Sequence, residues 1–155
     1  MTLRIALAQD NFLVGSIPEN AQKVRLLAQQ AKAQRSDIIV FPELCLTGYP
    51  PEDLLFRPSL TLRINEALAS LADIRDIVLV LGYPKVVRGQ LYNVAGAWLN
   101  GQCLVEYAKQ KLPNYQVFDE KRYFVEGQSA STFSYKNTCI ALTVCEDIWH
   151  EQPVA

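Results

Sequence analysis

The sequence predicts an α/β fold, and three observations lead to that prediction. Apolar stretches of strand length alternate with amphipathic stretches of helix length through the first half of the chain. Two further strand-like stretches, 91–99 and 103–108, flank Asn100-Gly101, a dipeptide typical of tight β-hairpins. The chain has 155 residues, which suits one domain of about 100–200 residues. We therefore expect a single domain, residues 1–155, in which parallel βα units are joined to an antiparallel pair.

The first half of the chain is expected to supply three buried parallel strands, over residues 3–8, 37–41 and 76–81. Pro42 ends the second of these strands, and Gly82 stops the third. Short apolar runs bounded by turn residues are typical of strands that are covered on both faces.

Two helices are expected between these strands. Ser16 and Glu19 fit a capping box, and apolar residues recur at three- and four-residue steps from Ile17 to Ala31. Residues 58–72 show the same helical spacing of apolar side chains. Each helix would therefore bury one face against the sheet.

The second half of the chain leads to a cysteine at the end of a strand. After a loop over 109–129 that is rich in proline, tyrosine and charge, the apolar run 138–144 predicts a last strand that ends at Cys145. A parallel sheet normally covers such a strand with a helix, yet the chain ends at Ala155. We therefore expect the fold to be truncated after the strand that carries Cys145.

Composition excludes several classes of function. Half of the residues are hydrophobic and the net charge is −1, so we expect a soluble protein that does not bind nucleic acid. The apolar runs are shorter than the ~20 residues of a membrane span, and no signal peptide is evident, so we expect a cytoplasmic location without a membrane partner. The four cysteines lack a C-x-x-C motif and His150 is the sole histidine, which predicts reduced thiols, no metal and no cofactor.

Three strand ends carry residues suited to nucleophilic catalysis. Cys145 would be either an inert core thiol or a nucleophile, because ligands of open α/β sheets bind at the carboxyl ends of strands. Glu43 would be a solvated loop acid or, beside Leu44 and Cys45, a general base with a raised pKa. Either Lys109 or Lys111 would supply the cation that a thiolate beside acids needs, since both face one side if the strand continues.

The order Glu43, Lys109, Cys145 resembles the nitrilase superfamily, whose amidases use a Glu-Lys-Cys triad on an αββα sandwich. Three stretches carry the resemblance: FPELCLTGYPPEDLL at 41–55, KQKLPNYQVFDEKRYF at 109–124 and VCEDIW at 144–149. Within the superfamily they are similar to the glutaminase domains of glutamine-dependent NAD synthetases, and the similarity extends over the whole chain.

The resemblance implies roles for individual residues. Glu43 would be the general base, Lys109 rather than Lys111 the catalytic lysine, and Cys145 the nucleophile. Supporting or substrate-binding roles are implied for Tyr49, Tyr115, Glu120 and Glu146.

The resemblance also implies a reaction and partners. Cys145 would release ammonia from glutamine through a thioester, and a synthetase domain of the same longer chain would use ATP and Mg²⁺ to amidate nicotinic acid adenine dinucleotide. We expect that domain to be missing from these 155 residues, because they contain no Gly-x-x-x-x-Gly-Lys or Ser-Gly-Gly-x-Asp loop. A homo-oligomer is implied as well. The alternatives are a stand-alone amidase or nitrilase, and an inactive fragment with a role in assembly.

Overall fold

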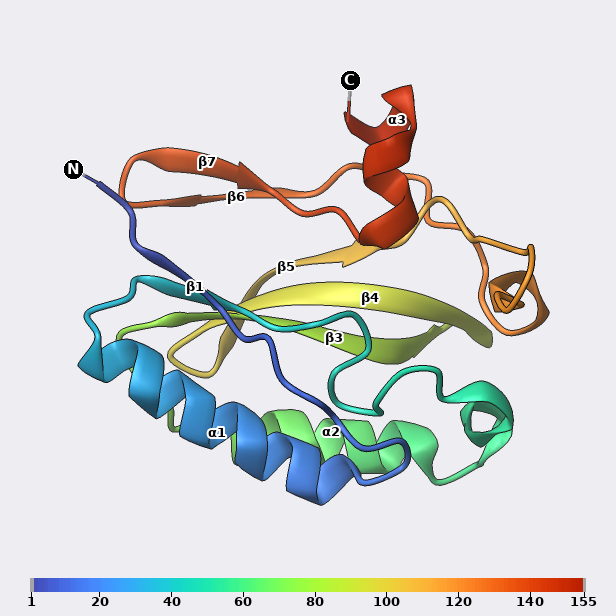
Figure 1. The fold of residues 1–155 in the computed structure, drawn as a ribbon, viewed down its shortest axis with the longest axis horizontal. Helices are drawn as coiled ribbons and strands as arrows, with labels where there is room; N and C mark the ends of the chain where they lie inside the picture. Colours follow the sequence, from blue (N-terminus) through green and yellow to red (C-terminus); the bar gives the residue numbers. More distant parts are fainter. Residues whose placement is uncertain (1, 155) are drawn as a thin grey trace.

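The computed structural model describes residues 2–154 and has a layered α/β architecture. A five-stranded sheet in the order β1-β2-β3-β4-β5 has two long helices on one face and a two-stranded sheet, β6-β7, on the other (Figure 1). The strands are β1 (Ile5–Leu7), β2 (Ile38–Val40), β3 (Val78–Val87), β4 (Gln90–Leu99), β5 (Gln102–Ala108), β6 (Thr132–Tyr135) and β7 (Thr138–Ala141). The helices are α1 (Ile17–Ala33), α2 (Leu60–Ser70), α3 (Glu151–Val154) and the 3₁₀ helices η1 (Glu52–Phe56), η2 (Glu120–Arg122) and η3 (Cys145–Trp149).

The parallel half of the sheet follows the prediction. β1 pairs with β2 and β2 with β3, both in parallel, and α1 and α2 form the connections between them. Alternation along the strands sends Ile39 and Leu79 to the core under the helices, and Ile38 and Val78 to a second core on the opposite face. The central strands are therefore buried on both faces.

Two details of this half differ from the prediction. Strand β1 was expected to be buried, but Ile5 is 53% and Leu7 77% exposed. Because β1 is the edge strand and only Ala6 packs on the helix-side core, its other side chains point away from the helices. Helix α1 begins where expected, but Ser16 donates a hydrogen bond from Oγ to Glu19 Oε2 over 2.7 Å instead of capping the backbone, so the capping box is not formed.

The antiparallel half contains two hairpins, of which the sequence predicted one. Asn100 and Gly101 have positive φ values and join β4 to β5, as expected. The prediction that Gly82 stops the third strand was wrong, because β3 continues to Val87 and pairs with β4 through a hairpin at Arg88-Gly89. A Cβ atom at Gly82 would collide with the backbone nitrogen of Leu44. Gly82 therefore serves close approach of the loop after β2 rather than a strand end.

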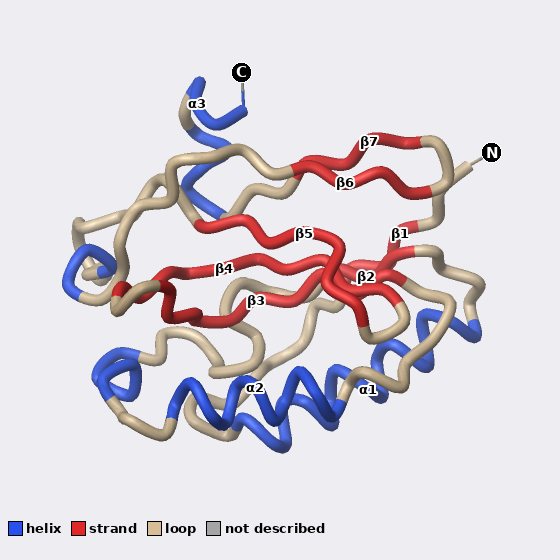
Figure 2. Tube along the Cα trace, turned by 180° about the vertical axis from the view of Figure 1, so that it is seen from behind, coloured by secondary structure: helices blue, strands red, loops and turns tan. Residues whose placement is uncertain are grey.

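The segment before Cys145 also differs from the prediction. The strand expected over 138–144 ends at Ala141, and β7 pairs with β6, which was not predicted, in a separate antiparallel sheet. Leu142 and Val144 remain buried and join the core that β6 forms with the main sheet. Figure 2 shows this hairpin lying across the sheet from the helices. Residues 2–154 thus present an α layer, a β layer and a second β layer, which are three layers of the predicted αββα sandwich.

No helix in the part of the chain that the structure describes has the length and apolar character needed to cross a membrane.

Candidate active site

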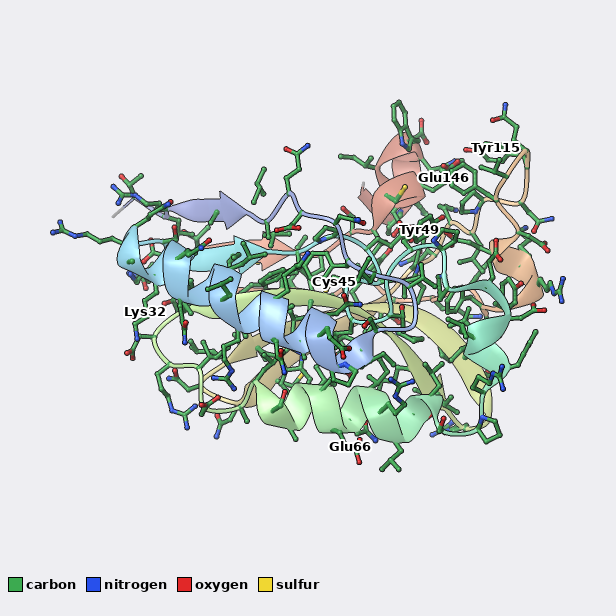
Figure 3. All side chains as sticks on the ribbon, turned by 60° about the horizontal axis from the view of Figure 1, so that its bottom comes forward. Lys32, Cys45, Tyr49, Glu66, Tyr115 and Glu146 are labelled. Atoms are coloured by element: carbon green, nitrogen blue, oxygen red, sulfur yellow. The ribbon has the colours of Figure 1, made fainter. Side chains whose placement is uncertain are left out.

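Three segments that are distant in the sequence converge beyond the ends of the strands. They are the loop after β2, the segment after β5 and the 3₁₀ helix η3 after β7. In Figure 3 the labelled side chains of Tyr49, Tyr115 and Glu146, one from each segment, lie at the same end of the molecule. Lys32 lies at the opposite end, and Cys45 is in the core between them.

Lys109 is the centre of this region. It follows the last residue of β5, and its backbone N–H donates to the carbonyl of Asn93 over 2.8 Å, which extends the β4-β5 ladder by one residue. Its side chain is buried, and Nζ donates to Glu43 Oε1 at 2.7 Å and to Glu120 Oε1 at 2.8 Å. Burial acts to lower the pKa of Lys109, but the two carboxylates outweigh it and hold the pKa above its ordinary value. The site therefore contains a buried cation paired with two carboxylates.

Glu43 is positioned by the loop that turns away from β2. The loop is fixed on β3 by hydrogen bonds from the N–H of Leu46 to the carbonyl of Gly82 and from the N–H of Phe41 to the carbonyl of Val80. Oε1 of Glu43 accepts hydrogen bonds from Lys109 Nζ and from Asn93 Nδ2, each over 2.7 Å. Both bonds fall on one oxygen, so Oε2 accepts none from residues 2–154. That oxygen is available to take a proton.

Glu120 is the second carboxylate on Lys109. It begins η2 and is buried, and its Oε1 also accepts a hydrogen bond from Tyr49 Oη over 3.3 Å. Burial and the charge of Glu43 raise the pKa of Glu120, against the lowering effect of Lys109. Burial together with Glu120 and Glu43 likewise raises the pKa of Tyr49.

Cys145 reaches this cluster from the second sheet. Contrary to the prediction, Cys145 does not follow a strand of the parallel sheet, because β7 belongs to the separate β6-β7 sheet. The thiol is nevertheless close enough to Glu43 and Lys109 for their charges to act on it. Partial burial and Glu43 raise the pKa of the Cys145 thiol above its ordinary value of 9.0, while Lys109 lowers it. The thiol is therefore protonated at neutral pH and needs a base before it can attack.

The remaining predicted residues lie on the solvent side of the cluster. Tyr115 Oη donates to Glu146 Oε2 over 3.0 Å, and this bond and burial raise the pKa of Tyr115. Tyr49 is 39% and Tyr115 51% exposed, so both rings are open to a ligand. Lys111 does not share a strand with Lys109, since β5 ends at Ala108, and its side chain makes no ion pair with residues 2–154.

Two polar residues of the site were not predicted. Asn93 is buried in β4 and binds Glu43; the signal for it was a lone amide in the apolar run 91–99. Asp147 is fully buried and accepts hydrogen bonds from Tyr107 Oη and from three backbone N–H groups. Its signal was a second acid, two residues after a thiol, for which the sequence indicated no separate role.

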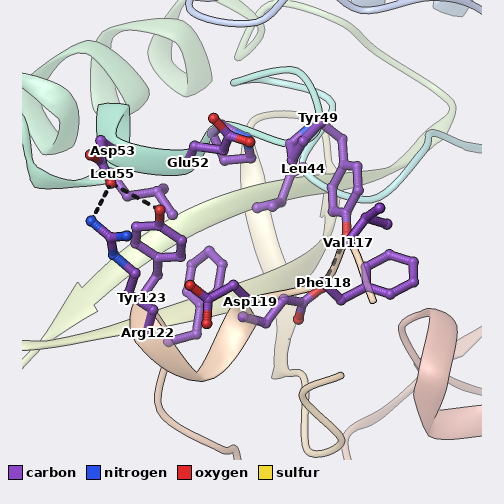
Figure 4. A pocket seen from close by; sticks show the side chains of 14 residues that line it. Leu44, Tyr49, Glu52, Asp53, Leu55, Val117, Phe118, Asp119, Arg122 and Tyr123 are labelled. Atoms are coloured by element: carbon purple, nitrogen blue, oxygen red, sulfur yellow. Dashed lines mark hydrogen bonds and ion pairs between the residues drawn. The ribbon is translucent and has the colours of Figure 1, made fainter. Parts of the chain in front are cut away.

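A cavity of about 290 Å³ adjoins the cluster on one side (Figure 4). Tyr49 and Glu120 line it, whereas Glu43 and Cys145 do not. At its far wall Asp53 accepts hydrogen bonds from Arg122 at 3.0 Å and Tyr123 at 2.9 Å. The cavity therefore flanks the reactive groups and shares two side chains with them. Within residues 2–154 no group of three or more His, Cys, Asp or Glu side chains is placed to hold a metal ion.

Comparison with known proteins gives a consistent result. Residues 4–154 match the model of the carbon-nitrogen hydrolase family. A glutamine-dependent NAD(+) synthetase of Acinetobacter baylyi is 44% identical over 149 residues, which are 96% of this chain and 28% of that protein. The chain thus spans between a quarter and a third of the length of such relatives.

Solved structures show the same likeness in three dimensions. A glutamine-dependent NAD+ synthetase from Acinetobacter baumannii superimposes with a TM-score of 0.93 at 46% identity, over 95% of this chain and 28% of that one. A mutant amidase from Nesterenkonia sp. AN1, which carries acrylamide added to its active-site cysteine, gives a TM-score of 0.84 at 25% identity, over 95% of this chain and 59% of the amidase.

Proposed function

The chain belongs to the carbon-nitrogen hydrolase family, and from this premise we propose that it is the glutamine-hydrolysing part of a cytoplasmic glutamine-dependent NAD synthetase. One observation carries the proposal: the buried ammonium of Lys109 is held between Glu43 and Glu120, and its charge reaches the Cys145 thiol. The identity of 44% to a glutamine-dependent NAD(+) synthetase supports the choice of substrate over other amides.

The first step is activation of the thiol. Cys145 is protonated at neutral pH, and Glu43 presents a carboxylate oxygen that accepts no hydrogen bond from residues 2–154. Glu43 takes the proton as Sγ attacks the side-chain carbonyl carbon of glutamine and forms a C–S bond. Lys109 stays charged throughout, so the negative charge that develops near it is offset without a further proton transfer.

The second step is release of ammonia. The tetrahedral intermediate carries an oxyanion, which Lys109 and the backbone N–H of Glu146 are proposed to bind. As the C–N bond breaks, Glu43 returns its proton to the leaving nitrogen, and ammonia departs from a γ-glutamyl thioester. Water then attacks the thioester while Glu43 takes its proton, and proton return to Sγ frees glutamate and the thiol.

The fate of the ammonia lies outside this chain. We propose that a synthetase domain of the same longer protein uses it, with ATP and Mg²⁺, to amidate nicotinic acid adenine dinucleotide. No residue of this chain is assigned to ATP or Mg²⁺. The homo-oligomer implied by the resemblance belongs to the same proposal, and light scattering on the purified protein tests it.

Ammonia release from glutamine tests the function. The protein, as expressed from its own gene, is incubated with glutamine, and ammonia is measured for the wild type, Cys145→Ala and Cys139→Ala. Loss of release in Cys145→Ala alone is the expected result, because Cys139 is an exposed thiol of β7 and serves as the matched control. Preferential release from simple aliphatic amides or nitriles, rather than glutamine, would instead support a stand-alone amidase like the Nesterenkonia enzyme.

A further inference from the structure

Asp147 has an environment unlike that of any carboxylate in the proposed chemistry. Its side chain is completely buried, and each of its oxygens accepts two hydrogen bonds. Oδ1 accepts from the backbone N–H groups of Gln110 at 3.1 Å and Lys111 at 2.8 Å. Oδ2 accepts from Tyr107 Oη at 2.7 Å and from the backbone N–H of Val144 at 3.0 Å. All four partners are dipoles, so the carboxylate is satisfied without an ammonium or guanidinium group.

These donors come from the two segments that bring the reactive groups together. Gln110 and Lys111 directly follow Lys109, and Tyr107 is two residues before it on β5. Val144 directly precedes Cys145. One carboxylate therefore binds the backbone on both sides of the gap between the thiol and the ammonium.

Asp147 also closes a ring around Cys145. The N–H of Asp147 donates to the carbonyl of Val144 over 3.1 Å, and the N–H of Val144 donates back to the Asp147 carboxylate. Between them Cys145 has a φ of +45°, a left-handed conformation that residues other than glycine adopt rarely. Such a conformation persists only when surrounding interactions fix it. The two reciprocal bonds supply that fixation.

We propose that Asp147 is a positioning residue that latches the Cys145 turn to the segment carrying Lys109 and thereby sets the separation of thiol and ammonium. It does not touch substrate and exchanges no proton in the reaction. The inference rests on the proposed function in one respect, namely that Cys145 is the reactive thiol.

Two variants weaken the latch in steps. Tyr107→Phe removes one of the four donors and keeps the ring that fills the core. Asp147→Asn keeps the shape of the side chain but leaves one acceptor oxygen in place of two, so a backbone N–H on one side of the latch faces an NH₂ group. The matched control is Tyr83→Phe. Tyr83 is equally buried and lies away from the cluster, and its Oη donates a hydrogen bond of 2.7 Å to the carboxylate of Glu106.

The measurement is the rate of alkylation by iodoacetamide, followed by mass spectrometry of each cysteine peptide. Cys103 and Cys139 are exposed and report on reagent and pH within the same digest, and Cys45 is buried and becomes labelled only if the protein unfolds. Melting temperatures are recorded in parallel. We expect Cys145 to react about tenfold more slowly in Tyr107→Phe, the factor corresponding to about one hydrogen bond to a charged group. In Asp147→Asn we expect about a 100-fold loss, as for a misplacement of about 1 Å at a reacting group.

The outcomes separate a latch from ordinary structural support. If Asp147 only stabilises the fold, Tyr107→Phe and Tyr83→Phe lower the melting temperature alike and leave the Cys145 rate unchanged, and that result overturns the proposal. An increased Cys145 rate overturns it as well. Should Asp147→Asn expose Cys45, Tyr107→Phe decides alone. Because alkylation needs no glutamine, a protein that releases no ammonia but shows the expected Cys145 rates would refute the proposed function and keep the latch.

Discussion

Carboxylates at two places near the Cys145 thiol are stabilised in different ways. In one, Glu43 and Glu120 share the ammonium of Lys109. In the other, Asp147 is surrounded by one hydroxyl and three backbone N–H groups. Both arrangements satisfy the requirement that a buried charge be paired or hydrogen-bonded. They differ in whether a carboxylate oxygen remains free to accept a proton.

The difference lies in the oxygens that remain open. Glu43 has one oxygen that accepts no hydrogen bond from residues 2–154, and Oε2 of Glu120 is buried without a partner among them. Asp147 has no oxygen without a partner, because each of its two oxygens already accepts two hydrogen bonds. A carboxylate with an open oxygen can exchange a proton, whereas a saturated one is suited to holding backbone in place. The first cluster is thus fitted for chemistry and the second for geometry.

Removing the Lys109 ammonium from between Glu43 and Glu120 should have the largest effect on ammonia release. We expect Lys109→Met to lower ammonia release from glutamine by about 10³-fold, because the oxyanion loses a charged donor. The free energy of unfolding should fall by about 3–5 kcal/mol, since two carboxylates stay buried without a counter-ion. Steady-state kinetics and urea unfolding give the two values.

Lys111→Met is the matched control for this experiment. Its side chain makes no ion pair with residues 2–154, and its backbone N–H bond to Asp147 survives the substitution. Wild-type ammonia release is expected. A comparable loss in both variants would contradict the assignment of Lys109.

Replacing the carboxylate of Glu43 by an amide tests its role as a base while keeping a hydrogen-bond acceptor in place. Glu43→Gln keeps an acceptor for Lys109 and Asn93 but cannot take a proton from Cys145. We expect kcat to fall by about 10²–10³-fold, within the range that general-base catalysis contributes, with little change in melting temperature. Glu66→Gln, on the exposed outer side of α2 (Figure 3), is the control. Retention of more than a tenth of wild-type kcat in Glu43→Gln would assign the base elsewhere.

The pH dependence of thiol reactivity sharpens the comparison further. Because burial and Glu43 raise the pKa of Cys145, its alkylation rate should keep rising through pH 9.0, the ordinary value for cysteine. Glu146 also raises that pKa, so Glu146→Gln should move the midpoint of the rate profile to lower pH. The rate at neutral pH would then increase a few-fold. A midpoint that stays fixed or moves upward would show that Glu146 does not act on the thiol through its charge.

The sequence predicted the parallel half of the fold because there local pattern and tertiary environment agree. Strands β2 and β3 are apolar on both faces, and the helix spacing of α1 and α2 matches the faces they bury. Prediction failed at two hairpins, β3-β4 and β6-β7, whose turns the sequence pattern did not reveal. Gly82 does not end β3, since its partner strand continues and Leu44 lies against it. The apolar run before Cys145 pairs with β6, and β6 was missed because its four residues, Thr132–Tyr135, are too few and too mixed in polarity to predict a strand.

The sequence indicated which residue types the site contains, but not which hydrogen bonds they form. Glu43 and Cys145 were selected from their places at expected strand ends, which left Lys109 and Lys111 as alternatives, and the family resemblance indicated Lys109 and Glu120. The structure places Glu43, Lys109, Glu120 and Cys145 within reach of one another's charges. Asn93 and Asp147 were not predicted, because the hydrogen-bond partner of Asn93 is 50 residues away in the sequence and three of the four partners of Asp147 are 36 to 40 residues away. Their roles are visible only once the strands are assembled.

A partly exposed ion pair stabilises a carboxylate in a third way, and we expect its removal to have the smallest effect. Asp37, at the start of β2, pairs with Lys136 in the β6-β7 turn, so the pair joins the two sheets. Hydrogen bonds from Lys136 and from the N–H of Arg4 hold the pKa of Asp37 below its ordinary value of 3.8. A depressed carboxylate pKa stabilises the fold above the unfolded-state value, and this stabilisation is lost as the pH falls through the folded-state value.

Lys136→Met should therefore lower the urea midpoint slightly at pH 7. The difference from the wild type should shrink as the pH falls below 3.8, because the lowered pKa keeps Asp37 ionised in the folded wild type until the pH passes that folded-state value. Salt at about 1 M should shrink the difference at pH 7, because its Debye length of about 3 Å screens exposed charges. A difference that grows on acidification would mean that Lys136 acts through packing. The Glu43–Lys109–Glu120 cluster should keep more of its contribution in salt, because the Lys109 side chain is fully buried and buried pairs are screened less.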